Sequence, residues 1–251
     1  MLQLGSASAE RGERVNREYH HWESAALGRA MEMLVFGHGG APVLVFPTSM
    51  GRFYQWEDFG MVDTLSHHLE QSWLQLYCVD SVDAESWYNR AAPGSWRGAR
   101  HNQYDAYLVD EVLPFIHAAN PTPYLIATGC SFGAYHAANF SFKHPELVNR
   151  CIAISGTYDL HFLLGGYYDD NCYFNNPVDY LPNLTDQRYL SAYHDHLSTI
   201  LVVGGDGDIC NAGTRQLDGV LNARGIPHTT DIWGPAWHDW PWWKQMVLKY
   251  I

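Results

Sequence analysis

Basic residues are scarce in this chain of 251 residues. Fifteen lysines and arginines stand against 27 aspartates and glutamates, which gives a formal net charge of −12. Nucleic acids and anionic membrane surfaces are bound through clustered basic side chains, and no such cluster offsets the acidic excess. The composition therefore argues against nucleic acid and against a membrane as partners.

Long apolar runs are also missing. No stretch reaches the ~20 residues that a transmembrane helix needs, and the N-terminus lacks the basic and then apolar segments of a signal peptide. Residues 1–16 combine small side chains with mixed charges, which predicts a loose leader. The five cysteines are odd in number and mostly lie in apolar segments, as free thiols in a reducing compartment do. We expect a cytoplasmic protein.

Apolar segments of strand length alternate with segments of helical periodicity along the chain. This alternation predicts an α/β fold with a mainly parallel central sheet flanked by helices, in a single domain over residues 1–251. Residues 156–196, rich in Tyr, Asn, Asp and Pro, follow the strand predicted at Arg150–Ser155 and interrupt the alternation. We predict that they form a short, irregular or partly helical insertion. Helices are predicted at 61–73, 101–119 and 240–250.

One turn carries the strongest chemical signal. An apolar run of strand length leads into Gly129-Cys-Ser131-Phe-Gly133, and a helical pattern of small residues follows at once. A Gly-x-Ser-x-Gly turn between a strand and a helix is typical of a nucleophile elbow, whose strained backbone exposes the serine hydroxyl. Glycines are needed at both ends because strand and helix approach too closely there for side chains. Ser131 is therefore the candidate nucleophile.

A serine hydroxyl is a weak nucleophile that needs a neighbouring base, itself oriented by a carboxylate. In the fold in which this elbow occurs, the three triad residues follow one another along the chain in the order serine, acid, histidine. Asp206 and Asp208 both follow the strand predicted at 199–204; we favour Asp208 and keep Asp206 as the alternative. His238 is the only histidine after the last predicted strand, 229–233, and is the candidate base.

Acyl transfer also needs backbone N–H groups that stabilise an oxyanion. Phe132, the residue after the nucleophile, is expected to supply one. The second is expected from the loop after the strand predicted at 42–46, where Ser49 and Met50 are both candidates and Met50 is preferred.

Aromatic residues are frequent in the loops that follow the strands. Trp87, Tyr168 and Trp240 are predicted to line a pocket for the acyl or alcohol group, although aromatic side chains also pack loops onto a core. The paired histidines, among them His194-Asp-His196, lack a third ligand at a recognisable spacing, so we predict no metal site.

Four segments carry a family resemblance: 46–53, 129–137, 173–181 and 237–243, which read FPTSMGRF, GCSFGAYHA, YFNNPVDYL and WHDWPWW. With Ser131, Asp208 and His238 they make the chain similar to the putative-esterase branch of the α/β-hydrolase superfamily. That branch includes S-formylglutathione hydrolases, feruloyl esterases, enterochelin-type esterases and mycolyltransferases. The resemblance implies carboxylic-ester hydrolysis without metal or organic cofactor, and an oxyanion hole completed by a backbone amide near Met50.

The leading hypothesis is a serine carboxylesterase that hydrolyses small or aromatic esters through an acyl-enzyme on Ser131. One alternative is an acyltransferase that uses the same three residues, and another is a binding module with a vestigial triad. The short segment 156–196 is no full lid, so long-chain fats are not expected as substrates. The expected partner is a small-molecule ester. The sequence does not determine the oligomeric state, and a homo-oligomer is one alternative.

Overall fold

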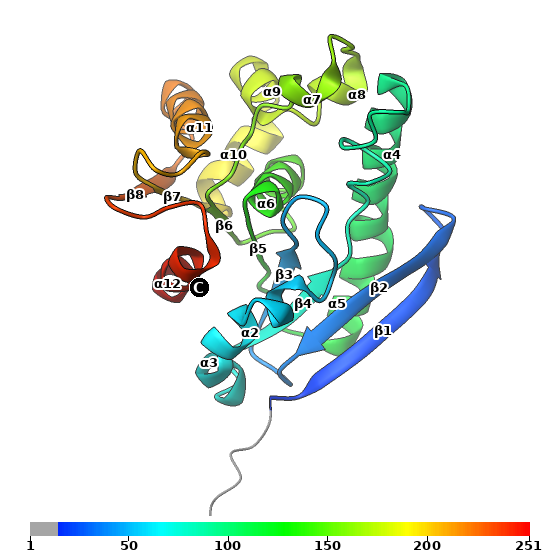
Figure 1. Cartoon of the computed structure of the whole chain (residues 1–251), viewed down its shortest axis with the longest axis vertical. Helices are drawn as coiled ribbons and strands as arrows, with labels where there is room; N and C mark the ends of the chain where they lie inside the picture. Colours follow the sequence, from blue (N-terminus) through cyan, green and yellow to red (C-terminus); the bar gives the residue numbers. More distant parts are fainter. Residues whose placement is uncertain (1–14) are drawn as a thin grey trace, which may run out of the picture.

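A computed structural model describes residues 15–251 (Figure 1), so the predicted leader, residues 1–16, lies almost wholly outside the described residues. Within 15–251, eight strands form one sheet in the order β1-β2-β4-β3-β5-β6-β7-β8. β1 pairs with β2 and β2 with β4 in antiparallel fashion, and all other neighbours are parallel. The mainly parallel sheet expected from the sequence is therefore confirmed. The strands are β1 (Arg17–Ser24), β2 (Arg29–Phe36), β3 (Ala41–Phe46), β4 (Leu74–Val79), β5 (Ile126–Cys130), β6 (Arg150–Ile154), β7 (Ser198–Gly204) and β8 (His228–Trp233).

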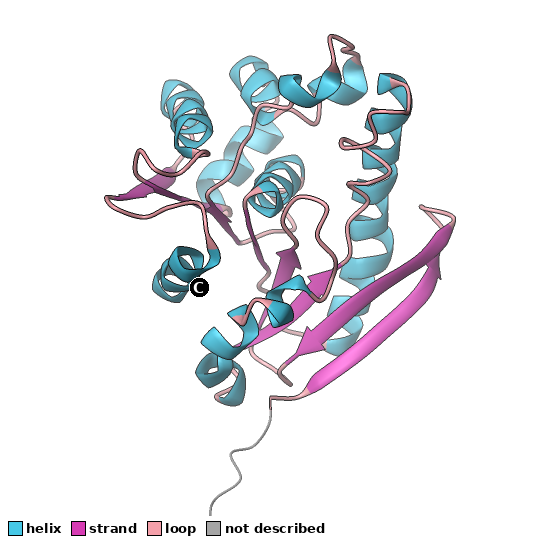
Figure 2. Cartoon of the chain, in the orientation of Figure 1, coloured by secondary structure: helices cyan, strands magenta, loops and turns pink. Residues whose placement is uncertain are grey.

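Helices cover both faces of this sheet (Figure 2). They are α1 (Gln55–Asp58), α2 (Met61–Thr64), α3 (Ser66–Glu70), α4 (Gly94–Tyr107), α5 (Leu113–Ala119), α6 (Phe132–Lys143), α7 (His161–Leu164), α8 (Asp170–Tyr173), α9 (Pro177–Asn183), α10 (Gln187–Asp195), α11 (Asn211–Arg224) and α12 (Trp240–Tyr250). A π-helical turn, η1 (Leu108–Val112), joins α4 to α5. No helix within residues 15–251 is long and apolar enough to cross a membrane.

Two large apolar cores lie on opposite faces of the sheet. α2, α3 and α12 close one core over the strands, and α4, α5, α6, α9 and α11 close the other. The central strands β3 and β4 are almost wholly buried, as expected for parallel strands covered on both faces. Helix α6, which begins directly after β5, is buried over most of its length.

The structure differs from the predicted elements where local geometry interrupts a periodic pattern. The helix predicted at 61–73 is two short helices, α2 and α3, because the backbone at Leu65 leaves helical geometry. The helix predicted at 101–119 begins seven residues earlier, at Gly94, and continues through η1 into α5. The segment 156–196 is partly helical, as predicted, and contains α7, α8, α9 and α10.

Candidate active site

Ser131 lies at the sharp turn between β5 and α6. Its φ of 57° falls in the left-handed region that non-glycine residues rarely adopt. A Cβ at Gly129 would lie 2.5 Å from the backbone of Gly133, and a Cβ at Gly133 would lie 2.5 Å from the carbonyl oxygen of Phe46. The two glycines are therefore required by the close approach of β3, β5 and α6, and this packing holds Ser131 in its strained conformation.

Three side chains predicted from distant parts of the sequence meet at the carboxyl ends of the strands. His238 Nε2 lies 2.9 Å from Ser131 Oγ, and His238 Nδ1 lies 2.9 Å from Asp208 Oδ1. An ionised carboxylate can only accept, so Nδ1 carries the proton and Nε2 is left to accept from the serine hydroxyl. Asp206, the alternative acid, is exposed, whereas the Asp208 carboxylate is buried against the imidazole.

The Asp208 carboxylate accepts four hydrogen bonds. Besides His238, the donors are the Ser155 hydroxyl at 2.6 Å and the backbone amides of Gly204 and Cys210 at 3.0 and 2.9 Å. Burial by itself would raise the pKa of Asp208, but these hydrogen bonds outweigh it and hold the pKa below its ordinary value. Asp208 therefore stays ionised at neutral pH and fixes the orientation and tautomer of His238.

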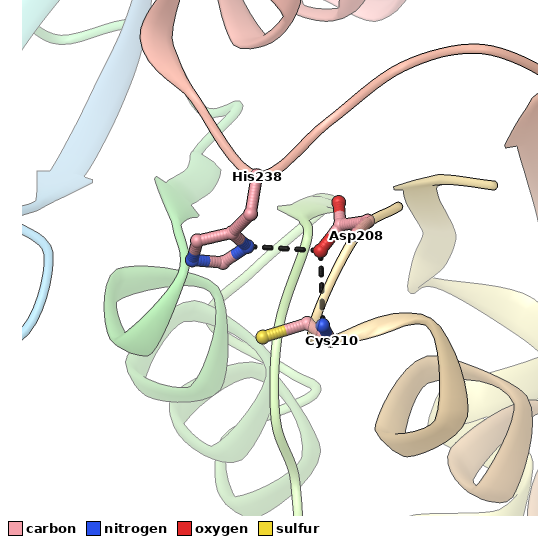
Figure 3. A group of neighbouring side chains, drawn as sticks. All are labelled: Asp208, Cys210 and His238. Carbon is pink, nitrogen blue, oxygen red and sulfur yellow. Dashed lines mark hydrogen bonds and ion pairs between the residues drawn. The ribbon is translucent and has the colours of Figure 1, made fainter. Parts of the chain in front are cut away.

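A cysteine lies next to the acid and the base (Figure 3). Ligand atoms of Asp208, Cys210 and His238 all lie within 4.8 Å of one another, a spacing that could hold a metal ion. A thiol must lose its proton to become a good ligand, and burial raises the pKa of Cys210 to about 12. In addition, the Asp208 and His238 atoms already bond to each other. For both reasons the group fits a metal ion poorly.

Three amides of the loop after β3 are occupied. The Thr48 N–H donates to Gln55 Oε1 at 2.8 Å, the Met50 N–H to Asp83 Oδ2 at 3.0 Å, and the Gly51 N–H to Thr48 O at 2.9 Å. This arrangement differs from the prediction that Met50 is the second oxyanion donor, because the Asp83 carboxylate already engages that amide.

The other two candidate donors are the amides of Ser49 and Phe132. Neither the Ser49 N–H nor the Phe132 N–H has a hydrogen-bond partner among residues 15–251. Tyr88 joins the two segments: its hydroxyl donates to Ser49 Oγ at 2.9 Å and its ring packs edge-on against Phe132 at 5.1 Å. Ser49, the other candidate from the sequence, is thus the residue whose amide is available.

Backbone strain is concentrated at this edge of the sheet. Within the described residues, four non-glycine residues have a positive φ, and three of them are Met50, Ser131 and Ser155. They follow β3, β5 and β6, which are neighbours in the sheet. Such conformations cost about 1–3 kcal/mol each and persist where the surrounding structure enforces them, often at functional sites.

The three aromatic residues predicted to contact substrate lie in different surroundings. Trp87 is fully buried and packs against His101, so it offers no surface to a ligand in this structure, which corrects that prediction. Trp240 is partly exposed and packs edge-on against Trp243, which in turn packs edge-on against His238. Tyr168, in the segment 156–196, stacks on His161 and donates to the Asp179 carboxylate.

Sequence reasoning missed the residues that support the triad from behind. Trp243 Nε1–H donates to Ser155 Oγ at 3.0 Å, and Ser155 in turn donates to Asp208. Asp83 and Tyr88 hold the loop after β3. All four act through contacts between residues far apart in the chain, so no spacing in the sequence signals them.

One family model matches most of the chain. The family described as "Putative esterase" matches residues 24–249 of the chain. No curated protein matches the sequence.

Solved structures share the fold at low sequence identity. A ferulic acid esterase superposes with a TM-score of 0.74 at 14% identity, over 94% of this chain and 96% of the other. An S-formylglutathione hydrolase from Staphylococcus aureus gives 0.71 at 13% identity, over 97% of both chains. An S-formylglutathione hydrolase from Agrobacterium tumefaciens gives 0.72 at 14% identity, over 94% of both chains. The predicted α/β-hydrolase fold is thereby confirmed. Because the family match spans most of its length, the chain belongs to the putative esterase family and is a serine hydrolase.

Proposed function

We propose that this serine hydrolase is a carboxylesterase that hydrolyses small or aromatic esters through an acyl-enzyme on Ser131. One observation carries the proposal: a serine hydroxyl, an imidazole and a buried carboxylate lie in one continuous hydrogen-bonded series. A nucleophile and its base must lie within about 2.6–3.2 Å of each other, and both distances in the series are 2.9 Å.

The reaction follows from this geometry in two halves. Ser131 Oγ attacks the ester carbonyl carbon while His238 Nε2 takes the hydroxyl proton, and Asp208 stabilises the imidazolium that forms. The tetrahedral adduct collapses, the C–O bond to the alcohol breaks, and His238 returns its proton to the departing oxygen. Water then attacks the acyl-enzyme in the same way and releases the carboxylic acid. These steps use side chains, backbone amides and water, so they require no metal or organic cofactor.

The negative oxygen of each tetrahedral adduct needs preorganised donors. We assign this role to the backbone amides of Phe132 and Ser49, in place of the Met50 amide that is bonded to Asp83. Phe132 is the first residue of α6, so its amide also benefits from the positive end of the helix dipole.

The preference for small or aromatic esters rests on the surroundings of His238. Trp240 stacks on Phe59 with a centroid distance of 4.6 Å and an interplanar angle of 11°, and the Phe59 side chain is 47% exposed. This aromatic pair lies one ring away from the base, through Trp243. It offers a flat apolar surface to an acyl group. A contact between Tyr168 and substrate remains a proposal from the sequence.

The test is turnover of p-nitrophenyl esters that vary in acyl length and aromaticity. Ser131→Ala and His238→Ala are expected to lower kcat by at least about 10³-fold, because nucleophile and base act as a unit. Ser191→Ala, which changes an exposed serine on α10, serves as the matched control and should keep full activity. A fluorophosphonate probe should label the wild type and leave Ser131→Ala unlabelled.

Two outcomes would redirect the proposal. Wild-type turnover retained in Ser131→Ala would remove Ser131 from the mechanism. Ester products that dominate over free acid in the presence of an acceptor alcohol would indicate an acyltransferase.

A further inference from the structure

A second buried acid–histidine pair lies beside the triad, and the mechanism above does not use it. Asp83, in the loop after β4, and His136, on α6, are both almost fully buried. His136 Nε2 lies 2.9 Å from Asp83 Oδ1, and the second oxygen, Oδ2, accepts the Met50 N–H at 3.0 Å. One carboxylate therefore ties α6 to the loop after β3.

These two segments are the ones that carry the free amides. Phe132 lies one helical turn before His136 on α6, and the two rings pack edge-on at 5.0 Å. Ser49 immediately precedes Met50, whose amide Asp83 holds. The Asp83 carboxylate thus links the two segments that carry the Ser49 and Phe132 amides.

The Thr48 amide, on the other side of Ser49, is fixed independently. Gln55 accepts the Thr48 N–H and donates back to Thr48 Oγ1, both at 2.8 Å. The Ser49 amide therefore lies between two amides that are each held by a side chain. A donor held in this way costs no reorganisation when negative charge develops on the substrate oxygen.

We propose that Asp83 and His136 are positioning residues that fix the geometry of the oxyanion hole. The inference rests on the proposed esterase function and adds to it a role for a buried pair outside the triad. A misplaced donor affects the transition state, in which the oxyanion exists, more than the bound ester. The pair should therefore act on kcat and leave KM nearly unchanged.

The first variant is His136→Phe, which keeps an aromatic ring of similar size but removes the donor to Asp83. Removing one oxyanion donor costs about 10²–10³ in kcat, so displacing one is expected to cost about 10- to 100-fold. KM should stay within about threefold, and Ki for a phenylboronic acid, which mimics the tetrahedral adduct, should rise in parallel with the loss of kcat. His136→Gln, whose Nε2 can donate from nearly the same place, should recover most of the activity.

The same helix provides a matched control. His144, at the end of α6 away from Ser131, bonds Asp105 through Nε2 at 3.1 Å. His144→Phe removes a similar pair and should keep kcat within about twofold of wild type if only the pair at Asp83 positions the donors. Circular dichroism and thermal melting of each variant establish that it is folded.

Asp83→Asn is the second variant, in case His136→Phe does not fold. Asparagine keeps one acceptor oxygen, so this variant loses one of the two charge-assisted bonds and weakens the other, and it should lower kcat by about tenfold, again with little change in KM. Folded variants of Asp83 or His136 with wild-type kcat and boronate affinity would overturn the inference. A rise in KM by the same factor as the fall in kcat would also overturn the inference, because it would indicate general structural damage. An equal fall in kcat in His144→Phe would overturn it for the same reason. If the wild type has no Ser131-dependent turnover, the proposed esterase function is wrong. Turnover by the wild type together with unchanged kinetics in the Asp83 and His136 variants contradicts only the positioning role.

Discussion

The indole of Trp243 lies at right angles to the imidazole of His238, with the ring centroids 4.9 Å apart. The same indole donates from Nε1 to Ser155 Oγ at 3.0 Å, and Ser155 donates onward to Asp208. One side chain on α12 therefore contacts His238 directly and is linked to Asp208 through Ser155. Because Trp243 belongs to α12, the docking of this helix onto the sheet is coupled to the geometry of the site.

Trp243→Phe separates the ring contact from the hydrogen bond. The phenyl ring can still face His238, but the donor to Ser155 is lost, so we expect kcat to fall by about 3- to 10-fold. Losing a buried hydrogen bond and part of a buried ring should lower the free energy of unfolding by about 1–3 kcal/mol. Ester kinetics and urea denaturation measure the two effects. Trp73→Phe is the control, because Trp73 is 54% exposed and packs beside His67 and His68; it should change neither quantity appreciably.

Ser155 invites a comparison of two substitutions, because its φ of 53° is unfavourable for any residue with a Cβ. Ser155→Ala and Ser155→Gly both remove the donor to Asp208 and should lower kcat by a similar factor, about tenfold. Glycine relieves the backbone strain, so Ser155→Gly should be about 1 kcal/mol more stable than Ser155→Ala. Chemical denaturation of the pair measures this difference. Equal stabilities would mean that the strain at this position has no energetic weight.

The local part of the fold could be predicted from the sequence because its causes are local. Burial on both faces gives β3, β4 and β7 their apolar runs, and burial on one face gives α12 its periodic pattern. The Gly-x-Ser-x-Gly spacing indicates a close approach of strand and helix. The order of the triad residues along the chain places the acid and the base in two particular loops. Ser131, Asp208 and His238 were therefore predicted as a set, and they lie together in the structure.

What the sequence could not provide depends on contacts across the fold. The sequence favours Met50 as an oxyanion donor, but its amide points toward Asp83, a residue 33 positions away. Trp87 lies in a loop that follows a strand, as a pocket residue would, yet its side chain faces the core and is fully buried. The direction of a single amide or indole depends on neighbours from other segments of the chain. The hydrophobic periodicity of the sequence therefore cannot predict it.

The elbow glycines should tolerate no side chain. A Cβ at Gly129 would lie 2.5 Å from backbone atoms of Gly133, which cannot move without separating β5 from α6. Gly129→Ala should therefore lower the free energy of unfolding by more than about 3 kcal/mol and abolish turnover, or prevent folding. Gly219→Ala on α11 is the control, because nothing lies within 4 Å of its Cβ and alanine favours a helix by about 1 kcal/mol. That variant should be more stable than wild type by thermal melting, with unchanged activity.

Asp105 should make the stability of the fold depend on pH in the acid range. Burial by itself would raise the pKa of Asp105, but the hydrogen bond from His144 and the charge of Lys143 lower it from 3.8 to about 2. Folding thus favours the ionised carboxylate, so its stabilising contribution is complete above pH ~4 and is lost as the pH falls from about 4 to about 2. At 1.36 kcal/mol per pKa unit, the contribution at neutral pH is about 2 kcal/mol.

Asp105→Asn tests this linkage. The variant should be less stable than wild type by about 2 kcal/mol at pH 7, and the difference should shrink steadily as the pH is lowered below about 4. Urea denaturation of both proteins between pH 7 and pH 3 measures the two curves. Asp63→Asn, an exposed carboxylate on α2, is the matched control, and its curve should run parallel to that of wild type. A stability difference between Asp105→Asn and wild type that stays constant down to pH 3 would show that the effect comes from packing, since a lost packing contact does not titrate.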